Sequence, residues 1–121
     1  MSSVIRSRHL LSVAVVLLAI PGAASAHAII VSSQPAAGVT IDKEATAIRL
    51  RFNSRIDHAR SRLRLRAPDG TEQTLQPATD APADEIDAQA RPLSPGAWHL
   101  HWQVLSVDGH ITRGDIPFNV R

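Results

Sequence analysis

Apolar and polar residues alternate with a period of two along much of this chain, and this alternation limits what the chain can fold into. It is clearest over residues 47–52, 61–67, 98–104 and 115–120. Side chains of a β-strand point alternately to its two faces, so each segment is predicted to be a strand with one buried and one solvated face. No stretch shows a convincing apolar stripe with the 3.6-residue period of a helix.

Turn-forming residues separate these segments at short intervals. Proline and glycine punctuate the chain at Gln34-Pro35 with Gly38, at Pro68-Asp69-Gly70 and at Ser94-Pro95-Gly96. Residues 71–76 are therefore predicted to pair with 61–67 as a hairpin. Residues 85–88 are predicted to form a short strand inside an otherwise polar loop.

This pattern of short strands and turns predicts an all-β fold. We expect a small Greek-key β-sandwich or barrel, immunoglobulin-like (cupredoxin-like), with about seven strands and both tryptophans in its core. Pro117 in the last strand indicates either an edge strand or a position that needs no ladder donor.

The first 26 residues have the pattern of a secretory signal peptide. Arg6 and Arg8 are followed by an apolar run over 10–20 and by the small-residue tripeptide Ala24-Ser25-Ala26. The run is shorter than the roughly 20 residues of a membrane span, so no permanent anchor is predicted. Cleavage after Ala26 gives an exported domain over 27–121 that begins with His27. Cleavage elsewhere, for example after Ala24, would leave that histidine inside the chain.

Composition narrows the function of the exported domain. Removing 26 of the 121 residues leaves 95, enough for one small domain. Two of the 13 basic residues leave with the signal, so 11 Lys and Arg face 11 Asp and Glu, and binding to nucleic acid is not expected. The chain has no cysteine and its one methionine is Met1, so the exported domain offers no sulfur ligand.

Histidines and carboxylates are the residues that remain for metal chemistry. An amino-terminal histidine such as His27 offers two nitrogens, one from the ring and one from an α-amine whose pKa is about 8. Asp108 and His110 are separated by one residue, and in extended chain such side chains project to the same side. Asp108-Gly109 is also a common turn sequence, in which the carboxylate only caps its own backbone.

Three stretches of the exported chain resemble the CopC family of periplasmic copper-binding proteins. They are the amino terminus HAIIVSSQPAAG, the strand IRLRFNS and the closing pattern GAWHLHWQVLSVDGHITRGDIPFNV, in which Ser-x-Asp-x-His is the most specific part. The resemblance implies a mononuclear copper(II) site, one ion per chain, made by His27, Asp108 and His110. It also implies a carrier or reservoir in the periplasm, with an inner-membrane copper transporter of the CopD type as partner.

The sequence departs from the family at two points. Some members bind copper(I) through a methionine-rich loop, and the exported domain has no methionine, so no such site is expected. Some members also place a glutamate near the copper, where this chain has Ser54 after Phe52-Asn53.

Two functions of other classes remain open from the sequence. A lytic polysaccharide monooxygenase also uses an amino-terminal histidine brace on a β-sandwich, although such enzymes are generally longer and have an axial aromatic residue at the metal. A metal-free sandwich that acts as an interaction module is the other alternative.

The remaining histidines and the arginine-rich strand are interpreted as structural. His99 and His101 are expected to be solvated on the polar face of the tryptophan strand, and His58 to lie in a loop. The arginines at 62, 64 and 66 are expected to form a solvated face that discourages edge-to-edge pairing of sheets.

Overall fold

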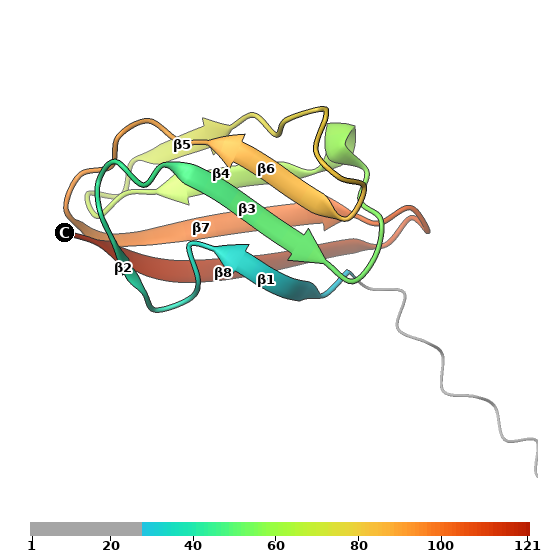
Figure 1. Cartoon of the computed structure of the whole chain (residues 1–121), viewed down its shortest axis with the longest axis horizontal. Helices are drawn as coiled ribbons and strands as arrows, with labels where there is room; N and C mark the ends of the chain where they lie inside the picture. Colours follow the sequence, from blue (N-terminus) through green and yellow to red (C-terminus); the bar gives the residue numbers. More distant parts are fainter. Residues whose placement is uncertain (1–27) are drawn as a thin grey trace, which may run out of the picture.

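The computed structural model describes residues 28–121, which form a sandwich of two β-sheets (Figure 1). The predicted signal peptide, residues 1–26, and His27 lie outside the described residues. The elements of the described part are β1 (Ile30–Gln34), β2 (Thr40–Ile41), β3 (Ala47–Phe52), the 3-10 turn η1 (His58–Arg60), β4 (Arg62–Arg66), β5 (Glu72–Leu75), β6 (Glu85–Gln89), β7 (Gly96–Leu105) and β8 (Ile111–Val120). None of residues 28–121 belongs to a helix long and apolar enough to cross a membrane.

The larger sheet contains five strands in the order β2-β8-β7-β4-β5. Its centre is a long antiparallel hairpin of β7 and β8, which pair from Gly96 opposite Val120 to Leu105 opposite Ile111. The hairpin predicted around Asp69-Gly70 is confirmed, because β4 and β5 pair antiparallel on either side of that turn. Gly70 has φ +88°, a conformation that glycine adopts without steric cost.

The smaller sheet contains three strands in the order β1-β3-β6, all antiparallel neighbours. The short strand predicted over 85–88 is confirmed as β6. Neither β1 nor β2 was predicted from the alternation, because β1 carries two serines at its centre and β2 is held to β8 by only two residue pairs. The described chain therefore has eight strands, against the seven or so predicted.

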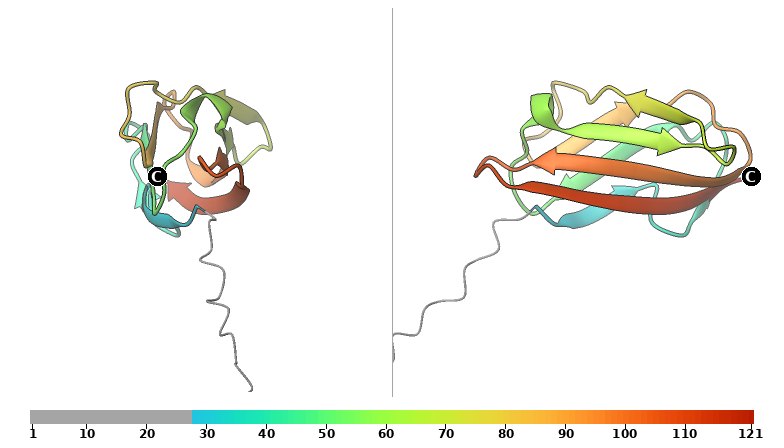
Figure 2. Two further views of the ribbon diagram at one scale, coloured as in Figure 1. Left: turned by 90° about the vertical axis from the view of Figure 1, so that its right-hand side faces the viewer. Right: turned by 180° about the vertical axis from the view of Figure 1, so that it is seen from behind.

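The chain crosses between the sheets after β1, β2, β3, β5 and β6, as expected of a Greek-key sandwich (Figure 2). The inward faces of both sheets supply the core, and the alternating residues of β3, β4 and β7 are buried as predicted. Both tryptophans are in this core, as expected. Trp98 donates from Nε1 to the Ser94 carbonyl at 2.8 Å. Trp102 meets Phe52 edge to face at 5.4 Å.

Pro117 lies at a position that needs no ladder donor, which is one of the two alternatives predicted for it. Its carbonyl accepts a hydrogen bond from the Gly38 N–H at 2.7 Å, on the side of β8 that faces away from β7. The nitrogen and carbonyl of one strand residue point to the same side, so the missing N–H of Pro117 leaves the β7–β8 ladder intact.

The arginines at 62, 64 and 66 lie on the solvated face of β4, as expected. Their interpretation as edge protection is wrong, because β4 lies between β7 and β5 and is not an edge strand. The alternation reports which face of a strand is buried, but it carries no information about the order of strands in the sheet.

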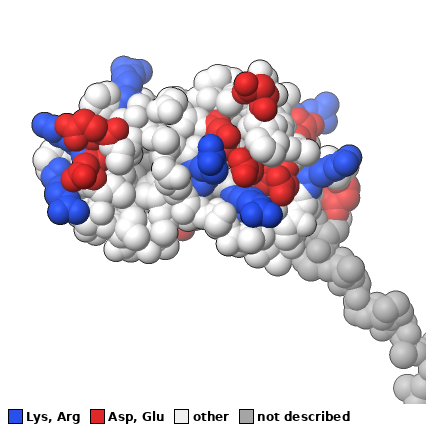
Figure 3. Space-filling model, viewed as in Figure 1, with Lys and Arg blue, Asp and Glu red and all other residues white. Residues whose placement is uncertain are grey.

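The outer face of the smaller sheet carries basic and acidic side chains side by side (Figure 3). Arg49 pairs with Asp87 at 3.2 Å and with Glu85 at 3.7 Å, and Arg51 pairs with Asp84 at 3.6 Å. These exposed pairs contribute little to stability individually, but they leave this face without a patch of one charge sign.

Gly114 of β8 provides a test of the core packing. A Cβ on Gly114 would lie 2.3 Å from Cζ2 and 2.4 Å from Cε2 of the Trp102 indole. Gly114→Ala is therefore expected to lower the free energy of unfolding by about 1–3 kcal/mol, as measured by urea denaturation. In a Trp102→Phe background the same substitution should cost less, since the smaller ring leaves room. An equal loss in both backgrounds would contradict this contact.

Candidate metal centre

Asp108 and His110 lie in the five-residue loop that joins β7 to β8. The loop is closed by two backbone hydrogen bonds, from the Ser106 N–H to the His110 carbonyl and from the Gly109 N–H to the Ser106 carbonyl, both 2.9 Å. Gly109 has φ +91°, so a side chain at this position would be strained. The sequence therefore folds locally into a tight turn, and not into the extended chain from which the spacing of Asp108 and His110 was first interpreted.

Ser106 holds the carboxylate of Asp108 in this loop. Its side chain is buried at the base of the loop, and its hydroxyl donates to Asp108 Oδ1. The same oxygen accepts from the His110 N–H at 3.1 Å. These two hydrogen bonds, the one from Ser106 first, lower the pKa of Asp108 from its ordinary value of 3.8.

The second oxygen of the carboxylate faces the imidazole of His110. Asp108 Oδ2 lies 3.2 Å from His110 Nδ1, and both side chains are on the surface of the loop, 36% and 55% exposed. The turn interpretation is thus confirmed, because Asp108 caps its own backbone through Oδ1. The same carboxylate lies against His110 through Oδ2, and the binding of one ion by both side chains stays a prediction.

The described chain begins at the same end of the molecule as this loop (Figures 1 and 2). Ala28 is fully buried, so the chain is packed into the core from its first described residue. Asn53 then holds Ile29 by two hydrogen bonds, accepting from the Ile29 N–H at 2.9 Å and donating from its own N–H to the Ile29 carbonyl at 3.0 Å. We call this pair of bonds the Asn53 clamp.

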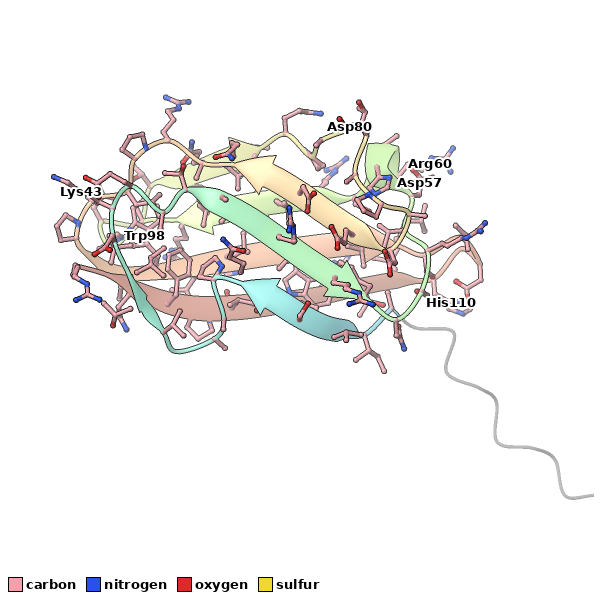
Figure 4. The ribbon with its side chains drawn as sticks, in the orientation of Figure 1. Lys43, Asp57, Arg60, Asp80, Trp98 and His110 are labelled. Atoms are coloured by element: carbon pink, nitrogen blue, oxygen red, sulfur yellow. The ribbon has the colours of Figure 1, made fainter. Side chains whose placement is uncertain are left out.

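The segment that follows Asn53 contacts the loop that carries Asp108 and His110. Ile56 forms an isolated β-bridge with Ser106, and the Val107 N–H donates to the Arg55 carbonyl at 3.3 Å. Residues 53–56 therefore connect the start of the described chain to the loop. In Figure 4, His110 lies at the end of the sandwich where the described chain begins.

Two of the three predicted metal ligands, Asp108 and His110, are therefore adjacent, and the third, His27, lies outside the described residues. Within residues 28–121, no group of three or more His, Asp or Glu side chains is arranged to hold a metal ion by itself. A three-residue centre at this end thus needs a ligand beyond those that the structure describes.

The other histidines make contacts that the sequence did not reveal. His58 lies in η1, and its Nε2 is 2.6 Å from the Glu85 carbonyl and 3.1 Å from the Pro82 carbonyl, so it connects η1 to the start of β6. His99 and His101 are on the polar face of β7, as expected, but they are not simply solvated, because both contact Asp115. The register of the β7–β8 hairpin would have indicated these contacts, because it places Asp115 opposite His101.

Ser106→Ala tests how the loop holds its carboxylate. Without the hydroxyl, the pKa of Asp108 in the metal-free protein is expected to rise toward 3.8, as measured by a carboxyl NMR titration. The lowered pKa stabilises the fold above the unfolded-state pKa, and this contribution is lost as the pH falls through the folded-state pKa. The difference in unfolding free energy between wild type and Ser106→Ala should therefore shrink as the pH is lowered from about 6 to about 2.

Ser32→Ala, at an exposed serine of β1, serves as the control for this experiment. A pKa of Asp108 that stays the same in Ser106→Ala would show that the hydroxyl does not set it.

Comparison with known proteins gives concordant matches. Residues 30–121 match the family model described as CopC domain. Protein YobA of Escherichia coli strain K12 is 31% identical over 99 residues, covering 79% of this chain and 80% of that protein. Copper resistance protein C of Xanthomonas campestris pv. juglandis is 31% identical over 114 residues, covering 81% of this chain and 83% of that protein.

Solved structures agree with these sequence matches. CopC from Methylosinus trichosporium OB3b superposes with a TM-score of 0.68 at 27% identity, covering 78% of this chain and 93% of that chain. PcoC, a methionine-rich copper resistance protein from Escherichia coli, superposes with a TM-score of 0.67, covering 78% of this chain and 99% of that chain. Because its sequence identity is only 23%, this match supports the fold alone. Because the family model spans residues 30–121 and relatives match most of the chain, this protein belongs to the CopC family.

Proposed function

We propose that the protein is a periplasmic copper(II) carrier or reservoir that binds one ion per chain and catalyses no reaction. Its membership in the CopC family and its 31% identity to Copper resistance protein C support the choice of metal. The observation that carries the proposal is the Asn53 clamp, which fixes the start of the described chain at the end of the sandwich that holds Asp108 and His110.

His27 is the bidentate ligand of the proposed site, through its α-amine and one ring nitrogen. It is bonded directly to Ala28, which is buried, and consecutive Cα atoms are only about 3.8 Å apart, so the core restrains where His27 can go. This role requires cleavage of the signal peptide after Ala26, because an α-amine exists on His27 only when it is the first residue.

The loop supplies the other two ligands. His110 provides an imidazole nitrogen, and its ring lies beside Asp108, whose Oδ2 is 3.2 Å from Nδ1. Asp108 provides the oxygen donor. Since its pKa is already lowered by Ser106 and the His110 N–H, copper does not have to displace a proton from it at neutral pH.

This donor set favours copper(II) over other divalent ions. Three nitrogens and one carboxylate oxygen suit a tetragonal centre, and copper(II) stands at the top of the divalent affinity order. The exported domain has no methionine, so we expect no copper(I) thioether site in it.

The position of the loop fits a carrier. The side chains of Asp108 and His110 are 36% and 55% exposed, so an ion bound there can reach another protein without unfolding of the sandwich. The signal-peptide pattern supports a periplasmic location, and an inner-membrane transporter of the CopD type is the proposed partner for the ion.

The start of the mature chain gives the most direct test of the proposed ligands. A protein with one extra residue before His27 is expected to bind copper(II) more than about 100-fold more weakly, since even the loss of an outer-shell contact costs about 10–100-fold. Copper(II) titration followed by electron paramagnetic resonance measures both the affinity and the change of spectrum. Equal binding and equal spectra for the two proteins would remove the α-amine from the site.

The same preparation separates a carrier from an enzyme. With a reductant, peroxide and a polysaccharide present, the copper-loaded protein is expected to oxidise no sugar. Oxidised saccharides in the product would instead support the monooxygenase alternative.

Asn53→Ala tests whether the Asn53 clamp positions the amino terminus. Loss of the Oδ1 acceptor releases the Ile29 N–H, and copper(II) affinity is expected to fall about 10-fold. Asn53→Asp keeps an oxygen acceptor and should retain most of the affinity. Asn119→Ala, at an exposed residue near the far end of β8, is the control. If Asn53→Ala binds as wild type does, the clamp does not position the ligand.

A further inference from the structure

Two histidines and one aspartate meet on the outer face of the five-stranded sheet, away from the proposed copper site. His99 Nδ1 lies 2.9 Å from Asp115 Oδ2, and His101 Nδ1 lies 2.8 Å from Asp115 Oδ1. The histidines are at i and i+2 on β7, and β8 places Asp115 directly opposite His101. All three side chains are between 34% and 45% exposed, so this cluster is open to solvent.

The shared carboxylate contacts both rings through their Nδ1 atoms. An ionised carboxylate only accepts hydrogen bonds, so His99 donates to it from Nδ1–H, and His101 Nδ1 lies 2.8 Å from its other oxygen. Within residues 28–121, no protein group is hydrogen-bonded to either Nε2. An imidazole whose second nitrogen donates to a carboxylate is the usual form of a histidine metal ligand. Here one carboxylate lies against the Nδ1 atoms of two imidazoles.

The spacing of the two rings allows them to share an ion. Their planes are 11° apart and their centroids 6.1 Å apart. With metal–nitrogen bonds of about 2.0–2.1 Å, the centroids of two imidazoles on one ion can be up to about 6.4 Å apart. To share an ion, the rings must turn their Nε2 atoms toward each other, and the exposure of both side chains permits this rotation.

The charges around the cluster are balanced. Arg64 and Arg66 of β4 lie across from His101 and His99 on the same face. Arg64 is paired with Glu72 at 3.5 Å, and the carboxylate of Asp115 lies on the same face as Arg66. Arg66, Pro68 and the three cluster residues line a hollow of about 550 Å³. A cation on the rings is therefore accessible and does not face an excess of positive charge.

We propose that His99 and His101 form a second metal site, which binds one borderline divalent cation through the two Nε2 atoms, with Asp115 as the orienting carboxylate. Copper(II) is the preferred ion and zinc the next, following the ligand type and the divalent affinity order. His101 lies five residues before Ser106 along β7, about 17 Å at the rise of a strand, so the two sites do not share ligands. The second site gives the carrier additional, weaker capacity that does not depend on the amino terminus.

The test is a copper(II) titration of the mature wild-type chain and of variants that separate the two sites. Wild type is expected to bind two ions, the second more weakly. His99→Gln/His101→Gln should lose the weaker ion and keep the tighter one with its resonance spectrum unchanged. His110→Ala should keep the weaker ion, so a failure of the proposed function does not obscure this result. In NMR spectra, that ion should broaden the amide signals of residues 99–101 and 115.

Asp115→Asn and His58→Gln complete the design. Asp115→Asn is expected to weaken the second ion by about 10–100-fold, because the rings lose their shared acceptor. His58→Gln should leave uptake of metal unchanged, since the Nε2 of His58 already contacts two backbone carbonyls. Zinc serves as a diamagnetic probe, and it should shift the ring ¹⁵N signals of His99 and His101 alone. The proposal would be overturned if His99→Gln/His101→Gln held the second ion as well as wild type does. It would also be overturned if neither wild type nor His110→Ala bound that ion.

Discussion

The anchoring of the first described residues is the constraint on which the proposed copper site depends. Ala28 is buried in the core, and the Asn53 clamp then fixes both backbone groups of Ile29. A flexible amino terminus would lose conformational entropy each time it bound a metal ion, and this entropic cost would weaken the binding. The sandwich already orders residues 28 and 29, so the proposed ligand His27 is attached to a fixed segment.

Ser106 has the corresponding role on the loop side. It contributes its backbone to the turn, its hydroxyl to Asp108 Oδ1 and its strand position to the bridge with Ile56. One buried residue therefore connects the loop to the segment that follows the Asn53 clamp. The end of the sandwich is a single hydrogen-bonded unit, although its members come from residue 29, residues 53–57 and residues 105–110.

The sequence predicts the fold well, because the core faces of β3, β4 and β7 keep a strict period of two. It does not predict β1, whose serines break that period, or the interior place of β4, because strand order depends on pairing between distant segments. At the site, the Ser-x-Asp-x-His spacing indicates the pair, but the turn that joins them depends on Ser106. The cluster around Asp115 escapes detection for a related reason, since it exists only once β7 and β8 are in register.

The central claim is that a freed α-amine, its own imidazole and the side chains of Asp108 and His110 bind one copper(II) ion together. Hyperfine spectroscopy on the mature protein with a single equivalent of copper(II), selectively ¹⁵N-labelled at histidine, tests it most directly. The account predicts one amine nitrogen and two imidazole nitrogens coupled to the metal. A spectrum with imidazole nitrogens but no amine nitrogen would contradict it.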